Sequence, residues 1–280
     1  MLLKALRNIA QPSFFIRHVG RKSRNSDIKP ISAKNSLLIR TTCFTAVSIS
    51  SIYVGSVILG YENYKINAKR IRTYSQETKE LLLEHFTSFL NWKDVRKFRE
   101  SDKIYLGILG ANLAVFLIHF MNLRMAPIPA ISQFTSIFSH THLVHLAMNM
   151  YVLHSFIDPL VQSLGREQFL ALYVSGGIFA SWLSMLRKIS IMSTIPSLGA
   201  SGCICSVIAF YCSSYPQGLL CIPLIENIIP HSFTAGNALN VILAIEAMGF
   251  MFFQRYSIID HSAHFGGLVF GLRVVNIYKD

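Results

Sequence analysis

The sequence predicts an all-α membrane protein, and three observations support this fold class. Hydrophobic residues make up 52% of the 280 residues and charged residues only 14%, whereas a soluble domain carries about 25% charged residues. The mean hydropathy is +0.43. Apolar runs near the length of about 20 residues that crosses a bilayer recur along the chain. Backbone groups in lipid must be satisfied internally, so we interpret these runs as helices.

The apolar runs divide into one isolated segment and a block of six. The isolated run covers residues 41–61, and a polar stretch, Glu62–Lys103, follows it with a helical pattern around 77–98. The runs of the block are 104–123, 142–161, 168–186, 198–215, 236–253 and 262–278. We therefore predict a six-helix bundle with one extra N-terminal transmembrane helix.

The same pattern divides the chain into four parts. They are a basic N-terminus (1–35), the extra transmembrane helix (36–61), a charged hydrophilic linker (62–103) and the six-helix core (104–280). Two connections in the core differ from plain turns. The segment 124–138 is apolar enough to lie in the membrane interface, and 218–230 is apolar but broken by Pro223 and Pro230.

The positive charge lies almost wholly ahead of the predicted core. The formal net charge is +12, and residues 1–103 hold 19 of the 26 Lys and Arg against 8 of the 14 Asp and Glu. That leaves 7 basic and 6 acidic residues for the hydrophobic body. Nucleic-acid binding needs basic side chains gathered on a folded face, so we expect no nucleic-acid partner.

The first 35 residues resemble a mitochondrial transit peptide. They are rich in Arg and Ser, they interleave basic with apolar residues, and Asp27 is their one acid. This composition is typical of a mitochondrial address, whereas a secretory signal has a longer unbroken apolar core. A disordered basic tail is the alternative. The positive-inside rule favours an N-terminus in the matrix.

No metal or cofactor is expected. The cysteines form no CxxC pair and lie mostly in apolar runs, which indicates small buried hydrophobes; they are Cys43, Cys203, Cys205, Cys212 and Cys221. A zinc protease would need a pattern such as HExxH, which is absent. An aspartyl membrane protease would need two intramembrane aspartates, whereas Glu246 is the one mid-span acid. We expect Glu246 to pair with a polar group of the bundle.

Polar residues inside membrane helices are functional candidates because they are costly there. His145 and Asn149, which follow His140, are four residues apart and share one helix face. Both can donate to one point, which suits a developing oxyanion. An interhelical hydrogen-bond pair is an equal alternative.

A second candidate is Ser201, which lies between Gly199-Ala200 and Gly202 at the start of a predicted helix. The glycines allow close backbone approach, and a helix N-terminus supplies free N–H groups. Glycine and serine are also common where membrane helices pack, so this signal is weak by itself.

The third candidate is His264 on the last predicted helix. Gly267 and Gly271 form a GxxxG pair, which lets two helices touch closely. His264 would be held against the helix that packs there, and if that helix carries Ser201, the serine gains a general base. His261, one turn away, competes for this role. Together the three clusters supply nucleophile, base and oxyanion donors for acyl transfer.

From about residue 100 onward, these motifs resemble the rhomboid family of intramembrane serine proteases, in its mitochondrial presenilin-associated branch. The donor motif matches at His140, His145 and Asn149, the nucleophile motif at Gly199, Ser201 and Gly202, and the last-helix motif at Ala263-His264-Phe265-Gly266-Gly267. The extra helix fits the one-plus-six rhomboid arrangement of that branch.

The resemblance implies a Ser201–His264 dyad without a third acid, and it selects His264 over His261. The Ser201 backbone N–H, His145 and Asn149 would hold the oxyanion, and His140, Gly199, Gly202, Gly267 and Gly271 would have structural roles. Substrates would be single-span membrane proteins of mitochondria, met in the lipid bilayer of the inner membrane. Membrane scaffold or protease partners are also compatible with it.

Two departures from the family pattern stand out. Several bacterial members carry a Tyr stacked on the catalytic His four residues after the nucleophile, where this chain has Cys205. Their Trp-Arg pair is absent from 124–138. A catalytically inactive rhomboid-like protein that binds clients is the alternative of another class, but such proteins typically lose Ser or His. A transporter is disfavoured because no repeat pairs its two halves.

Overall fold

The computed structural model describes residues 30–88, 99–120, 133–140, 142–193, 199–221, 231–255, 257 and 259–279. Most of the predicted transit peptide therefore lies outside the described residues, and residues 30–35 begin the first helix. Residues 124–132 and 222–230 of the two predicted connections also lie outside them.

The described residues are mostly helical, in agreement with the predicted fold class. The helices are α3 (Pro30–Ser88), α4 (Glu100–Phe120), α6 (Leu143–Leu164), α7 (Arg166–Ser190), α8 (Ser201–Ser214), α9 (Ala235–Met248) and α10 (His261–Lys279). Shorter elements are the 3₁₀ turn η1 (Ser136–Phe138), the π turn η2 (Gly249–Phe253) and the antiparallel strands β1 (Leu219–Leu220) and β2 (Phe233–Thr234).

Four helical segments of the described chain are long and apolar enough to cross a membrane. They are Asn35–Asn67, Glu100–Ile118, Arg166–Ser190 and Ala235–Phe253, and Ser201–Ser214 is a shorter apolar helix. The sequence is therefore that of a helical membrane protein.

Helix α3 is much longer than the apolar run that predicts it. The run covers residues 41–61, but the helix continues through the charged stretch to Ser88. No Gly or Pro occurs between Tyr61 and Ser88, and Lys, Glu, Gln and Leu favour helix there. Hydropathy marks the part of a helix that suits lipid and does not mark where the helix ends.

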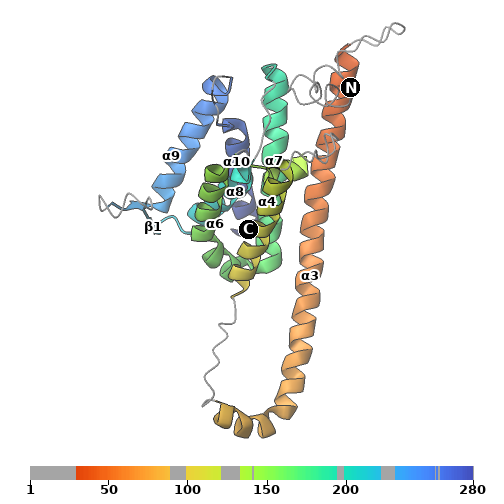
Figure 1. The fold of residues 1–280 in the computed structure, drawn as a ribbon, viewed down its shortest axis with the longest axis vertical. Coiled ribbons are helices and arrows are strands. Elements are labelled where there is room, and N and C mark those ends of the chain that lie inside the picture. Colours follow the sequence, from red (N-terminus) through yellow and green to blue (C-terminus); the bar gives the residue numbers. More distant parts are fainter. Residues whose placement is uncertain are drawn as a thin grey trace.

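The core of the molecule is formed where α7, α8 and α10 pack together (Figure 1). Helix α3 runs along α7 at one side of this core, and α9 lies at the opposite side, where it contacts α8 and α10. The largest fully buried side chains include Phe169, Tyr173, Leu153, Leu160 and Leu268.

Glycines allow α10 to lie directly on α8. A Cβ atom on Gly267 would overlap the carbonyl oxygen of Gly202, and one on Gly271 would overlap that of Ser206. Backbone therefore meets backbone at both positions, so the helix against the GxxxG pair is the one that begins with Ser201.

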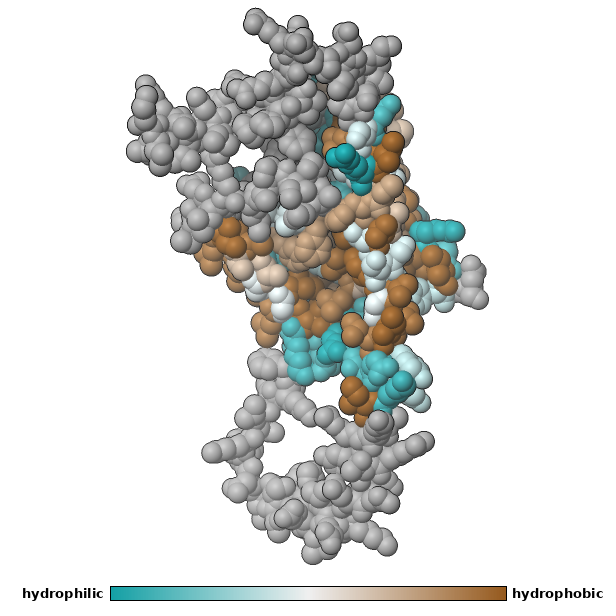
Figure 2. Space-filling model, turned by 90° about the vertical axis from the view of Figure 1, so that its right-hand side faces the viewer, coloured by the Kyte–Doolittle hydropathy of each residue, from teal (hydrophilic) through white to brown (hydrophobic). Residues whose placement is uncertain are grey.

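The outer faces of the peripheral helices are apolar. Val54 and Val57 of α3 are each 60% exposed, and Val241 of α9 is 59% exposed. Figure 2 shows hydrophobic residues over most of the middle of one face, with many of the hydrophilic residues gathered below it. Such apolar surface fits contact with lipid.

Candidate active site

Ser201 is the first residue of α8 and is partly exposed. Gly199, two residues earlier, has φ +122°, a backbone conformation that L side chains rarely adopt. The first N–H groups of a helix have no partner within the helix. The serine hydroxyl therefore lies beside the free backbone N–H groups at the N-terminus of α8.

The loop before Ser201 is held by two bonds from its backbone. The Gly199 N–H donates to the Ser136 carbonyl at 3.0 Å, and the Ala200 N–H donates to Nε2 of His140 at 3.3 Å. His140 is 2% exposed, and burial, followed by the neighbouring His145, lowers the pKa of His140 to about 4. His140 is therefore neutral near pH 7, and its unprotonated Nε2 accepts the bond.

His145 lies against the same loop. A Cβ atom on Gly199 would come within 2.8 Å of the His145 Cε1 atom, so glycine makes room for this ring. The rings of His140 and His145 meet edge to face, with centroids 5.1 Å apart. The sequence predicts that His145 donates to an oxyanion. In the structure its ring lies beside the loop that precedes Ser201.

Asn149 uses part of its donor capacity within its own helix. Its Nδ2 donates to the His145 carbonyl at 2.9 Å, and its side chain is buried. An amide nitrogen carries two hydrogens, so one remains for another acceptor. The structure keeps Asn149 one helical turn behind His145 rather than beside it at the loop.

His264 lies on α10, one turn before Gly267, and is 20% exposed. The carbonyl of Ala263, the residue before it, comes within 3.6 Å of the space a Cβ would fill on Gly202. The two chain segments that carry Ser201 and His264 are therefore adjacent. Among the hydrogen bonds of the described residues, none joins the Ser201 hydroxyl to the His264 ring. Catalytic bonds are often long before substrate binds.

A narrow cavity opens beside Ser201. Its volume is about 10 Å³, which is about the size that one water molecule needs. Its walls come from η1, α7, Gly199, the start of α8, the start of α10 and the residue before α10. The polar residues among them are Ser136, Ser181, Ser201 and Asp260.

Comparisons with known proteins identify the family of this chain. Residues 127–279, more than half of the chain, match the Rhomboid domain. The chain belongs to the rhomboid family. Presenilin-associated rhomboid-like protein A, mitochondrial, of Danio rerio is 33% identical over 84% of this chain and 69% of its own length. The presenilin-associated rhomboid-like protein, mitochondrial, of Homo sapiens is 32% identical over 84% of this chain and 65% of its own.

A fungal relative extends the match. Rhomboid protein 1, mitochondrial, of Saccharomyces cerevisiae is 30% identical over 68% of this chain and 56% of its own length. The chain thus spans about two thirds or less of the length of these relatives. All three are named mitochondrial, and with its apolar helices this rhomboid is a mitochondrial membrane protein.

Glu246 pairs with polar groups of the bundle, as the sequence predicted, and the structure identifies these partners, which the sequence did not. Its Oε1 lies 2.9 Å from Nδ1 of His264, and its Oε2 lies 2.7 Å from Nδ1 of His261. The resemblance implied a dyad without an acid. Position 205, one of the two departures from the family pattern, holds a buried cysteine. A single acid in the middle of an apolar helix was the one available signal.

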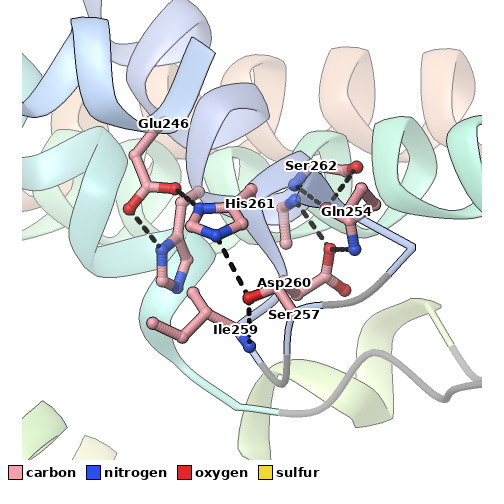
Figure 3. Close-up of polar contacts among 9 residues, drawn as sticks. Glu246, Gln254, Ser257, Ile259, Asp260, His261 and Ser262 are labelled. Atoms are coloured by element: carbon pink, nitrogen blue, oxygen red, sulfur yellow. Dashed lines mark hydrogen bonds and ion pairs between the residues drawn. The ribbon is translucent and has the colours of Figure 1, made fainter. Parts of the chain in front are cut away.

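A buried polar network fixes the start of α10 near these histidines (Figure 3). Asp260 pairs with Lys188 of α7 at 2.5 Å and accepts from Ser184 at 2.7 Å. Gln254 donates to Asp260 at 3.3 Å and accepts from the backbone N–H of Ser262 at 2.8 Å. Buried charges need such partners, and here the pair ties α10 to α7.

Proposed function

We propose that this rhomboid is an intramembrane serine endopeptidase that cleaves single-span transmembrane segments of mitochondrial proteins. Ser201 attacks the scissile carbonyl, and His264 takes the hydroxyl proton and returns it to the leaving amine. The observation that carries this proposal is the backbone contact of Gly267 with Gly202, because it brings the helix of the base onto the helix of the nucleophile.

The oxyanion of the tetrahedral intermediate would be held from two sides. The Ser201 backbone N–H at the start of α8 supplies one donor, and the His145 ring and the Asn149 amide supply others. His140, Gly199 and Gly202 shape this corner, and Gly267 and Gly271 hold α10 against it. These roles are supported by the Gly199–His145 contact and by the bond from Ala200 to His140.

The architecture we propose is one extra transmembrane helix followed by six. The extra helix would cover 36–61 within α3, the linker 62–103, and the protease core 104–280, after a transit peptide at 1–35. The protein would lie in the mitochondrial inner membrane with its N-terminus in the matrix. The order of the helices and the mitochondrial relatives support this arrangement.

A cleavage assay on purified protein in liposomes with a model single-span substrate tests the function. Ser201→Ala and His264→Ala are each expected to abolish cleavage, since nucleophile and base act as a unit. A fluorophosphonate probe should label the wild type at Ser201 and leave Ser201→Ala unlabelled.

Matched controls separate chemistry from folding. Ser214→Ala, at the far end of α8, and His154→Ala, on the exposed side of α6, should cleave as the wild type does. Wild-type cleavage by either Ser201→Ala or His264→Ala would refute the dyad, and a lethal His261→Ala would move the base to that ring. A folded wild type that binds the substrate without cutting it would favour the client-binding alternative.

A further inference from the structure

The carboxylate of Glu246 sits between two imidazole rings. Its two oxygens are shared, one to each ring, at 2.9 Å from Nδ1 of His264 and 2.7 Å from Nδ1 of His261. Figure 3 shows this carboxylate facing the ring of His261. We propose that Glu246 is the positioning residue that orients His264 for catalysis, and that His261 holds Glu246 in place. This inference rests on the proposed function.

The three side chains are largely withdrawn from solvent. Glu246 is 13% exposed, His261 12% and His264 20%. A carboxylate in such surroundings is costly unless hydrogen bonds satisfy its oxygens. Both oxygens are satisfied by ring N–H groups, so the site accounts for a charge on an otherwise apolar helix.

The bond to Glu246 determines which nitrogen of His264 is left to accept a proton. When Nδ1–H donates to a carboxylate, the proton is kept on that nitrogen and the lone pair on Nε2. A general base for Ser201 needs that lone pair. The carboxylate also stabilises the positive ring that forms when the proton is taken up.

No aromatic ring takes over this task at position 205. Cys205 is buried, and a Cβ on Gly267 would come within 2.9 Å of its Cβ atom. The small residue lets α10 approach α8, but it cannot stack on an imidazole. The orientation of the His264 ring therefore depends on its polar contact with Glu246.

His261 is itself held from three directions. Its Nε2 lies 3.1 Å from the Ser257 hydroxyl, and its Nδ1 contacts Glu246. A Cβ on Gly249 would overlap the His261 ring, so glycine at that position leaves the space the ring occupies. His261 is thus placed to fix the carboxylate rather than to act as the base.

The arrangement links the base to the position of α9. Leu239 and Ala235 are the buried residues of α9, and both lie in its first half. Among the described side-chain hydrogen bonds, those of Glu246 are the ones that join α9 to α10. A displacement of the second half of α9 would withdraw the carboxylate and leave His264 unoriented.

The test compares Glu246→Gln with Glu246→Asp in the liposome assay. The glutamine variant loses the charge at nearly constant shape and should lower kcat about 10²-fold with KM nearly unchanged, because general-base catalysis is worth about 10²–10⁴-fold. The aspartate variant keeps the charge and should recover to within about tenfold of the wild type. Fluorophosphonate labelling of Ser201 should slow in the same order.

The control is Glu100→Gln, which removes a carboxylate that is 52% exposed on α4, and it should leave kcat unchanged. If the wild type does not cleave, the proposed function fails. If the wild type cleaves, Ser201→Ala does not, and Glu246→Gln keeps wild-type kcat, only the role of Glu246 is refuted. A fall of equal size in Gln and Asp would also refute it, since a charge requirement predicts rescue.

A second variant covers the case in which Glu246→Gln does not fold. Gly249→Ala displaces the His261 ring while leaving the Glu246 charge in place. It should lower kcat about tenfold, as expected when a catalytic group is only partly misplaced. Unchanged kcat in a folded Gly249→Ala protein would refute the role of His261.

Discussion

Helix α10 is held by two different kinds of interface. Against α8 it makes backbone contacts at Gly267 and Gly271, whereas against α9 its polar contacts all go to the single carboxylate of Glu246. Close packing resists displacement because interiors leave little free volume, but a pair of hydrogen bonds can break and re-form. The proposed nucleophile, Ser201, and the proposed base, His264, are thus joined through the rigid interface, and we expect the orientation of the His264 ring to depend on the adjustable one.

The same contrast occurs around the loop before Ser201. Gly199 meets the His145 ring through steric fit alone, while a chain of hydrogen bonds supports the loop from behind. The Thr45 hydroxyl of α3 lies 3.1 Å from the Gln133 side-chain oxygen and 2.8 Å from the Thr41 carbonyl. Ser136 donates to the Gln133 carbonyl at 3.1 Å, and the Ser136 carbonyl accepts from Gly199. If steric contacts dominate, substitutions at the glycines should lower cleavage activity more than substitutions that remove these hydrogen bonds.

The largest effect is expected for Gly267→Ala. The added methyl group meets the Gly202 carbonyl, which cannot move without shifting α8, and overpacking of this kind costs about 1–3 kcal/mol or more. Cleavage and fluorophosphonate labelling should fall to background, and thermal unfolding should begin earlier. Gly107→Ala, where a Cβ meets nothing within 4 Å, should match the wild type. A fully active Gly267→Ala protein would show that α10 does not lie on α8 as described.

Gly199→Ala should have the second-largest effect on cleavage. It combines an unfavourable φ of +122° with a contact at 2.8 Å from His145, so the proposed oxyanion site must distort. We expect kcat to fall about 10²-fold, as for loss of one oxyanion donor. Gly165→Ala is the matched control, because its φ of +79° is also positive but a Cβ there meets nothing within 4 Å. Gly165→Ala should lose stability and keep kcat.

Acid should loosen the same loop through His140. The folded pKa of about 4 lies below the ordinary value of 6.5, so the unfolded chain binds the proton more readily between these values. The stability that the neutral ring contributes is present above about pH 6.5 and is lost as pH falls towards 4, by about 3 kcal/mol in all. Thermal unfolding of the wild type and of His140→Gln, compared from pH 7 to 4, measures this. Parallel curves would contradict it.

The smallest effect is expected for Thr45→Val. The change keeps the shape of the side chain and removes its hydroxyl, which contacts both the Gln133 side chain and the Thr41 carbonyl. A hydrogen bond of this kind is worth about 1 kcal/mol. A two- to threefold fall in kcat, or about 0.4–0.7 kcal/mol at the barrier, is expected if the loop relaxes. Thr42→Val, which removes the acceptor of the Trp182 bond instead, should leave kcat unchanged.

Family and fold class could be predicted from the sequence, because they depend on local patterns. Apolar runs indicate membrane helices, and the motifs around Ser201, His145 and His264 led to the rhomboid family, which the match over 127–279 confirms. The helix ends were less predictable, since α3 continues to Ser88 on propensity rather than hydropathy. The catalytic assignments stay predictions.

The partners of Glu246 could not be predicted. Its two histidines lie 15 and 18 residues along the chain, on the next helix, and their meeting depends on how α9 tilts against α10. The bond from Asn149 to its own helix could not be predicted either. The spacing of His145 and Asn149 permits a bond within the helix and a contact at the Ser201 loop equally. Tertiary packing determines which of these contacts form, and it cannot be inferred from a single sequence.

The length of α3 has a mechanical consequence. Its apolar part alone, Asn35–Asn67, has 33 residues, which at about 1.5 Å each reach about 50 Å, against a hydrocarbon layer of about 30 Å. Beyond this part Figure 1 shows the helix continuing and then turning sharply at its lower end. A straight helical segment longer than the lipid layer leaves a part outside it, so a force on that part would tilt the part inside. Thr45 lies within this apolar part and contacts Gln133, so such a tilt would reach Gln133 and, through Ser136, the loop ahead of Ser201.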